Sequence, residues 1–287
     1  MNTEIEALIK LLDDPDESIY NAVNNKLHSY GNELLPILET YTGTITNTIQ
    51  QARLELLIKQ FQYNDIKNDL TNWCTQPHND LLYGAFIIAK LQNYNANYNV
   101  ISTEVNQLKK DIWIELNSYL TPLEKVNIIN NIVFKYNRYG GTEINYTKQQ
   151  EFFIPNLVQI KKGNSFSLII LYTVLAQMLD VPIVALKFPK QMILCYLDTH
   201  LDYSNKAENN FFKIKFFIDP IFGAIISHND VELFFRRMNV PPTISYFRPL
   251  SNKKILQTIL IEYAKCKTDN EISISSNELE TLIKILD

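Results

Sequence analysis

The chain has 287 residues, and its 27 Lys and Arg against 31 Asp and Glu give a formal net charge of −4. With 46% hydrophobic and 20% charged residues, this composition excludes a wholly disordered chain and is sufficient for a large buried core. The acidic balance argues against a nucleic-acid partner, because phosphate backbones attract basic surfaces. Only 7 glycines are present and no glycine-rich phosphate loop occurs, so we expect no nucleotide cofactor.

The amino terminus gives no indication of export. Residues 1–6 lack the positive charges and the following apolar stretch of a signal peptide. Nowhere does the sequence reach the ~20 consecutive apolar residues that span a bilayer, so we expect no membrane partner. The three cysteines, Cys74, Cys195 and Cys266, lie far apart in the sequence, as reduced thiols do. Together these features predict a cytoplasmic protein.

The first third of the chain has the pattern of paired helices. Asp14, followed by proline and by Glu17 three residues later, predicts the start of a helix, and Gly31 is placed to end it. A second helix begins near Leu34, so residues 14–41 resemble a single HEAT-type repeat. One such repeat cannot stack on itself, and we expect it to pack on neighbouring helices.

Further helices are predicted before residue 140. Thr121 and Glu124 form a capping box at the start of the last one. The expected ranges are 45–64, 80–93, 102–119 and 121–136.

The pattern changes after two adjacent glycines at 140 and 141. Residues 165–179 are apolar on nearly every face, which is typical of a helix buried on all sides. Short extended segments follow, and in the third of them apolar residues alternate with lysines, which indicates a strand with one wetter face. A buried helix followed by an antiparallel sheet predicts an α+β core. The expected strands are 183–186, 192–197 and 211–219, with a polar loop at 204–210, and the expected closing helices are 251–266 and 275–286.

The order of these elements resembles the transglutaminase-like superfamily, and within it the bacterial SirB-type branch. The resemblance covers about residues 5–285 and implies a papain-like core between a helical amino-terminal region and a short helical tail. The three expected parts are 1–75, 76–248 and 249–287. The motifs that carry the resemblance are Asp-Asp-Pro-Asp at 13–16, Gly-Asn-Glu-Leu-Leu-Pro at 31–36, Leu-Leu-Tyr-Gly-Ala-Phe-Ile-Ile-Ala-Lys at 81–90, Gly-Asn-Ser-Phe-Ser-Leu at 163–168, Phe-Pro-Lys-Gln at 188–191 and Ile-Asp-Pro at 218–220.

The resemblance also implies where a catalytic triad belongs. The superfamily uses a cysteine at the start of the buried helix, a histidine on a following strand and an acid on the next. These positions fall on Ser165, with Ser167 as the second candidate for the nucleophile position, on Gln191 and on Asp219. A serine hydroxyl needs an adjacent base, and a glutamine amide cannot shuttle a proton. We therefore expect a degenerate site without catalysis, in a protein with an interaction or regulatory role and an unidentified protein partner.

Each of these residues also has a purely structural interpretation. Ser165 is a good helix N-cap, and Asp219 is expected to bind neighbouring backbone or the Gln191 amide. Cys195 belongs to an apolar strand and is expected in the core. Cys74 and His78 have ligand-like spacing but no second ligand pair, so we expect no metal site.

Two alternatives have a different functional class. A divergent hydrolase or acyl-transferase would pair Ser165 or Ser167 with His200 or His228 as base. A peptide- or small-ligand-binding module would instead present an open pocket near Gln191. Its expected lining residues are Tyr172, Phe188 and Lys190.

Overall fold

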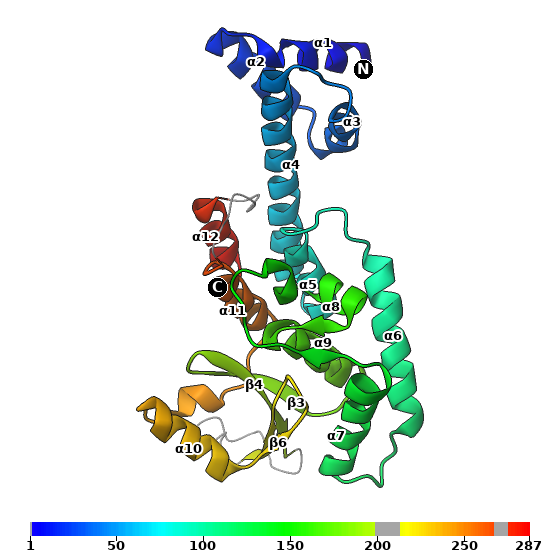
Figure 1. The fold of residues 1–287 in the computed structure, drawn as a ribbon, viewed down its shortest axis with the longest axis vertical. Helices are drawn as coiled ribbons and strands as arrows, with labels where there is room; N and C mark the ends of the chain where they lie inside the picture. The colour runs from blue at the N-terminus through cyan, green and yellow to red at the C-terminus, as the bar shows by residue number, and fades with distance from the viewer. Residues whose placement is uncertain (1, 199–212, 267–274) are drawn as a thin grey trace.

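The computed structural model describes residues 2–198, 213–266 and 275–287. Helices surround one antiparallel sheet of four strands in the order β3-β4-β5-β6 (Figure 1). The predicted α+β class is confirmed. Within the described ranges, none of the helices is both long and apolar enough to span a bilayer.

The amino-terminal region is entirely helical and has its own core. The side chains of this core include Leu12, Leu27 and Leu38, each fully buried. Figure 1 shows these helices at one end of the molecule. The elements are α1 (Asn2–Lys10), η1 (Leu11–Asp13), α2 (Glu17–His28), η2 (Asn32–Leu34), α3 (Leu35–Tyr41) and α4 (Thr48–Thr75).

Helix α4 connects this region to the rest of the chain. Its first half, including Leu54 and Phe61, packs in the amino-terminal core, whereas Ile66 and Trp73 pack in the large central core. Where the two cores meet, the Lys90 ammonium binds carboxylates of α4 at 2.7 and 3.1 Å. The helix therefore extends well past residue 64, where the sequence predicted its end.

The central core is formed around one buried helix, α9 (Ser165–Met178), which leaves almost no side chain of its first three turns exposed. This agrees with the predicted all-round burial. Packed around it lie α5 (Leu81–Ala89), α6 (Tyr98–Glu115), α7 (Pro122–Asn130), the π-helix η3 (Asn131–Tyr136), η4 (Gln149–Phe152) and α8 (Ile154–Ile160). A short parallel bridge joins β1 (Gly140–Gly141) to β2 (Lys162–Gly163) directly before α9.

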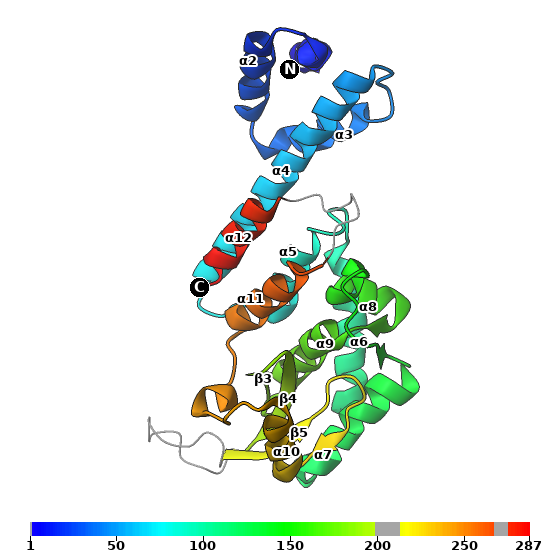
Figure 2. The ribbon, with the colours of Figure 1, turned by 60° about the vertical axis from the view of Figure 1, so that its left-hand side comes forward.

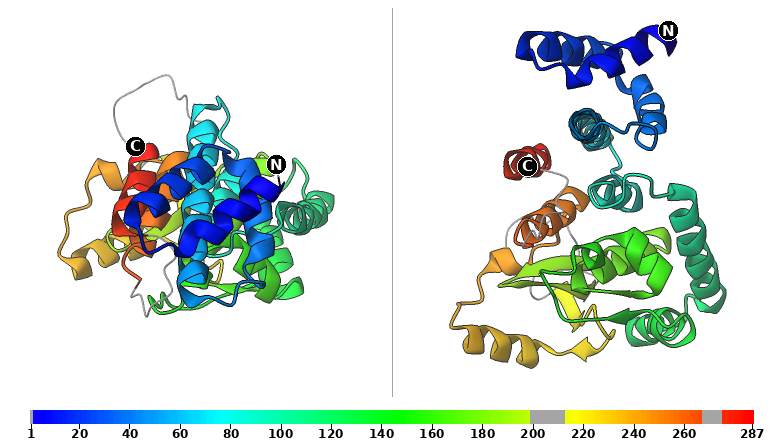
Figure 3. Two further views of the ribbon diagram at one scale, coloured as in Figure 1. Left: turned by 90° about the horizontal axis from the view of Figure 1, so that it is seen from above. Right: turned by 45° about the horizontal axis from the view of Figure 1, so that its top comes forward.

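The sheet has α9 on one face and a smaller helical layer on the other (Figure 3). Along β4, Leu194 and Tyr196 pack in the core that contains α9, and Ile193 and Cys195 pack in a separate core on the opposite face. Both faces are therefore buried. The elements are β3 (Ile183–Phe188), β4 (Gln191–Leu197), β5 (Ile214–Ile218), β6 (Ile225–Ile226), α10 (His228–Met238) and η6 (Ile244–Phe247).

The carboxy-terminal helices α11 (Asn252–Tyr263) and α12 (Ser276–Ile285) belong to the central core. Leu256, Leu260 and Leu282 are fully buried in it. Figure 2 shows α12 lying along α4, and Gln257 of α11 donates to the Ile283 carbonyl at 3.1 Å. The tail thus packs on the second half of the long helix.

Several local expectations need correction. The first predicted helix is capped by Asp16, which accepts from the Ser18 amide, and not by Asp14. In the third strand Lys215 is exposed, as the alternation predicted, but Phe217 on the same face is fully buried in the core on the α10 side. Helices α8 and α10 were not predicted. The capping box at Thr121 is confirmed, and the polar loop 204–210 lies outside the described residues.

Candidate functional site

The start of α9 is the position implied for a nucleophile. Its N-cap is Asn164, whose Oδ1 accepts from the amides of Phe166 at 2.9 Å and Ser167 at 3.3 Å. Asn164 is fully buried. Ser165 is the first helical residue and not the cap, which corrects the structural interpretation from the sequence.

The two serine hydroxyls have different environments. Ser165 exposes 5% of its surface, and its Oγ makes no hydrogen bond among the described residues. The Ser167 Oγ lies 2.8 Å from the Glu151 carbonyl and 3.2 Å from the Asn164 carbonyl. Carbonyl oxygens only accept, so Ser167 donates its proton to backbone. Neither hydroxyl is hydrogen-bonded to a titratable side chain in the part of the chain that the structure describes.

Gly163 makes this arrangement possible. A Cβ at this position would lie 2.2 Å from the Ser167 Oγ, much closer than non-bonded atoms approach. The absence of a side chain at 163 therefore lets the Ser167 hydroxyl reach the Glu151 backbone. Gly163 is also held in the parallel bridge, where its carbonyl accepts from the Thr142 amide at 2.9 Å.

Glu151 is a buried carboxylate beside this site that sequence reasoning missed. It is 6% exposed, and its Oε2 accepts from the Thr142 hydroxyl at 2.9 Å. Its Oε1 lies 3.2 Å from the Lys148 ammonium. Buried carboxylates need such partners. Glu151 ends a polar segment, Lys-Gln-Gln-Glu at 148–151, whose composition is typical of a surface. Nothing in the sequence therefore indicated that Glu151 is buried.

Gln191, in the position implied for the histidine, does not face α9. It is the exposed first residue of β4 and pairs with Phe188 across a two-residue turn. Successive residues of a strand point to opposite faces, so Gln191 shares its face with Ile193 and Cys195, on the α10 side. Lys190, in the turn, is exposed and has a φ of 64°.

Asp219 forms a local turn. Its Oδ1 accepts from the amides of Ile221 at 2.6 Å and Phe222 at 3.1 Å, and its carbonyl accepts from the Gly223 amide at 2.9 Å. This agrees with the backbone-binding interpretation. Ser165, Gln191 and Asp219 are not joined by any hydrogen bond in the described structure.

The aromatic residues expected to line a pocket lie in different cores. Tyr172 on α9 is 1% exposed and donates to the Asn130 Oδ1 at 3.0 Å, and burial raises its pKa above the ordinary tyrosine value. Phe188 is 2% exposed and packs with Phe235 and Phe247 on the opposite face of the sheet. The expectation of one pocket near Tyr172, Phe188 and Gln191 is therefore wrong.

The two candidate bases have different outcomes. His228 opens α10, and its ring lies 5.3 Å from the Phe217 ring in the core on the far side of the sheet from α9. It is not placed to accept a proton from either serine. His200 lies outside the described residues.

Cys74 and His78 have the spacing of metal ligands, but they form no metal centre in the described structure. Within residues 2–198, 213–266 and 275–287, no group of three His, Cys, Asp or Glu side chains could hold an ion. The Cys74 thiol donates to the Ile285 carbonyl at 3.6 Å. Cys195 is fully buried, as expected, and burial raises the pKa of its thiol, which keeps it protonated.

Comparisons with known proteins agree with the fold. Residues 99–260 match the family described as the transglutaminase-like superfamily. UPF0162 protein BU173 of Buchnera aphidicola subsp. Acyrthosiphon pisum is 23% identical over 190 residues, which are 64% of this chain and 66% of that protein. A UPF0162 protein of Buchnera aphidicola subsp. Schizaphis graminum is 26% identical over 148 residues, or 52% of this chain and 50% of that protein. The matches thus span less than two thirds of each relative. No solved structure matches the chain.

Proposed function

The chain belongs to the transglutaminase-like superfamily, and we propose that it is a non-catalytic member with an interaction or regulatory role. The observation that carries this proposal is the environment of the two serines at the start of α9. Ser167 donates to backbone carbonyls, and Ser165 has a buried hydroxyl without a described partner. Without a base to take the proton, a serine hydroxyl is a weak nucleophile.

The orientation of the other two positions supports the same proposal. Gln191 is exposed on the α10 side of the sheet, and Asp219 binds amides of its own turn. Loss of general-base help alone costs on the order of 10²–10⁴ in rate, and loss of the nucleophile in a cooperative triad costs roughly 10⁶. Acyl transfer by the superfamily mechanism is not expected from such an arrangement.

Three finer assignments complete the proposal. We place the chain in the SirB-type branch, on the ordered motifs of its sequence. We propose a HEAT-like role for α2 and α3, which pack with α4 in a core of their own. The three free thiols support a reducing, cytoplasmic location, and the partner is proposed to be a protein.

An activity assay tests the absence of catalysis. The purified 287-residue chain is incubated with acyl donors and with ester and amide substrates, alongside Ser165→Ala and Ser167→Ala. We expect the three proteins to give the same uncatalysed rate. Turnover that one of the two substitutions abolishes would overturn the proposal.

A variant with the superfamily's residue types at these positions tests the same proposal independently. The triple substitution Ser165→Cys, Lys190→Gly and Gln191→His restores the residue types that the superfamily uses. Because position 191 faces away from α9, we expect no gain in turnover. A gain of tenfold or more would contradict the proposed orientation of the strand.

A further inference from the structure

We propose that the loop between β5 and β6, residues 219–223, is a latch that closes the start of α9, and that Asn130 holds it closed. The inference rests on the proposed function and adds how the base-free site is kept from solvent. Figure 2 shows the yellow loop that follows β5 lying beside α7. Its shape is set within the loop itself, because the Asp219 carboxylate and carbonyl bind amides of residues 221–223.

Asn130, the last residue of α7, joins this loop to α9. Its Nδ2 donates to the Gly223 carbonyl at 2.7 Å, and its Oδ1 accepts from the Tyr172 hydroxyl at 3.0 Å. A carbonyl only accepts hydrogen bonds, so Gly223 fixes which way the Asn130 amide points. Aspartate has the same shape but lacks the donor. Asn130 also stands where α7 passes into the π-helix η3, and single π-turns within helices are frequent at functional sites.

The second attachment of the loop is to β1. A Cβ built on Gly141 would lie 2.8 Å from the Ile221 Cβ and 2.9 Å from the Ile221 Cα, which is closer than such atoms approach. The missing side chain at 141 therefore gives Ile221 its place. Gly141 is paired with Gly163 in the parallel bridge, two residues before Ser165.

These two attachments lie on either side of Ser165. Ser165 and Tyr172 are seven residues apart, which is close to two turns of an α-helix, so both face the same side of α9. The loop is joined to one end of this stretch through Gly141 and Gly163, and to the other end through Asn130 and Tyr172. It therefore spans the side of α9 on which Ser165 is 5% exposed.

The loop is placed to open as a unit. In the described structure, the Asn130 amide makes the one hydrogen bond that joins residues 219–223 to a helix. The outer side of the loop is in solvent, where Phe222 is 72% exposed. A segment with so few attachments opens at a lower free energy than the core beneath it. Its own hydrogen bonds need not break when it does.

Alkylation of a thiol at position 165 tests the latch. In the Ser165→Cys protein, Asn130→Asp sets a carboxylate oxygen against the Gly223 carbonyl oxygen and removes the donor. A buried thiol reacts when its cover opens, so we expect alkylation about tenfold faster or more. Asn127→Asp is the matched control, because it adds the same charge at an exposed position of the same helix. It should leave the rate unchanged.

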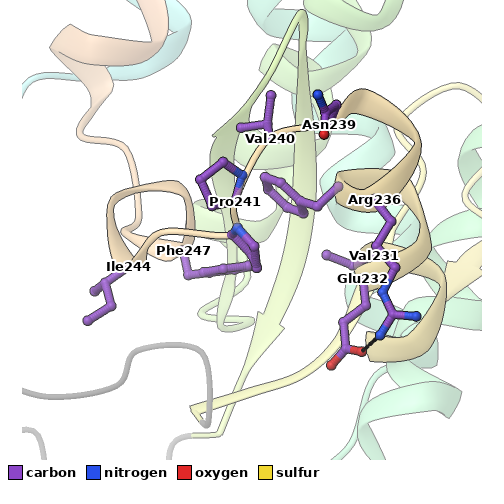
Figure 4. A pocket seen from close by; sticks show the side chains of 10 residues that line it. Val231, Glu232, Arg236, Asn239, Val240, Pro241, Ile244 and Phe247 are labelled. Carbon is purple, nitrogen blue, oxygen red and sulfur yellow. Dashed lines mark ion pairs between the residues drawn. The ribbon is translucent and has the colours of Figure 1, made fainter.

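A second pair of variants acts on the other attachment. Gly141→Ala forces the Ile221 backbone away and should also accelerate alkylation at position 165. Gly140→Ala is its control, since no atom lies within 4 Å of the added Cβ. Ile244→Ala is a remote control on the far face of the sheet, in the cavity of about 680 Å³ that α10 and residues 239–247 line (Figure 4). Neither control should change the rate.

Cys195, fully buried in the core on the α10 side, reports global unfolding in the same samples. The latch predicts faster alkylation at position 165 with an unchanged rate at Cys195, measured by mass spectrometry. If Asn130→Asp or Gly141→Ala leaves the rate at position 165 unchanged, or accelerates both thiols equally, the proposal is overturned. Alkylation measures access and not turnover, so its failure leaves the proposed absence of catalysis standing.

Discussion

The two faces of the four-stranded sheet are both covered by helices, but the polar side chains of these helices are buried on one side and exposed on the other. On the α9 side, the Ser167 hydroxyl is bound to backbone, and Ser165 is 5% exposed. On the α10 side, Arg236 and Glu232 remain at the surface beside a cavity of about 680 Å³. Both faces of the sheet are buried, but the α9 side, where the resemblance places the nucleophile, encloses its serine hydroxyls, whereas the α10 side keeps charged groups at its outer surface.

The largest change in stability should come from a side chain of the sheet that is buried against α9. Leu194 is fully buried against the α9 core, and Leu194→Ala should lower the free energy of unfolding by about 2–5 kcal/mol, because the cavity it leaves refills only in part. Gln191→Ala, at the exposed start of the same strand, should change it by less than about 0.5 kcal/mol. Urea denaturation compares the two, and a loss above about 1 kcal/mol for Gln191→Ala would indicate that its amide is engaged in the fold.

The second largest change in stability should come from alkaline pH, which deprotonates a tyrosine of the core that contains α9. Burial raises the pKa of Tyr263 to about 12, against about 10 in an unfolded chain. The folded state thus holds this proton more tightly, so its stabilisation is complete below about pH 10 and is lost as the pH rises toward about 12. The loss should approach 2–3 kcal/mol. Tyr263→Phe should flatten the fall of stability with pH, and Tyr119→Phe, at a residue 94% exposed, should leave the slope unchanged. The reverse pattern would contradict the burial of Tyr263.

A smaller loss of stability is expected from a substitution at the residue that packs against the first turn of α9. Gly163→Ala places a Cβ against the Ser167 Oγ, so the hydroxyl must rotate away from the Glu151 carbonyl. An unsatisfied buried hydroxyl costs about 1–3 kcal/mol. Gly140→Ala is the control, because no atom lies within 4 Å of the added Cβ. Thermal melts that move equally for both variants would argue against the close approach.

The smallest change in stability should come from the turn between β3 and β4. Lys190 has a φ of 64°, a left-handed conformation that costs a residue with a side chain about 1 kcal/mol. Lys190→Gly should therefore raise stability, by up to about 1 kcal/mol after the entropy that glycine gains in the unfolded chain. Chemical denaturation measures the difference, and a clear destabilisation would contradict this turn geometry.

Local patterns in the sequence predicted much of the fold. The capping box at Thr121 and the all-round apolar pattern of α9 each marked a real element. The end of α4 was missed because its two halves pack in different cores, with Phe61 in one and Ile66 in the other. A helix that changes its buried face has no single apolar stripe to follow. The cap of α9 was placed one residue late, since both Asn164 and Ser165 are good N-caps.

The arrangement of the candidate site was harder to predict. Period-two alternation assigns side chains to faces only when one face is polar, and β4 is apolar at both Ile193 and Leu194 because both faces are buried. Nothing in the strand itself therefore indicated that Gln191 faces α10. Glu151 lies in a short polar segment, and its burial follows from long-range packing against α9.

The most direct test of the sealed, base-free start of α9 is the reactivity of a thiol placed there. Ser165→Cys is alkylated under native conditions over a range of pH, and mass spectrometry locates the label, with Cys74 and Cys195 as internal references of partial and complete burial. The account predicts slow labelling at position 165, comparable to Cys195, with no thiol pKa below the ordinary value of about 8.5. Rapid labelling at pH 6, faster than at Cys74, would indicate an accessible and activated thiolate and would contradict the account.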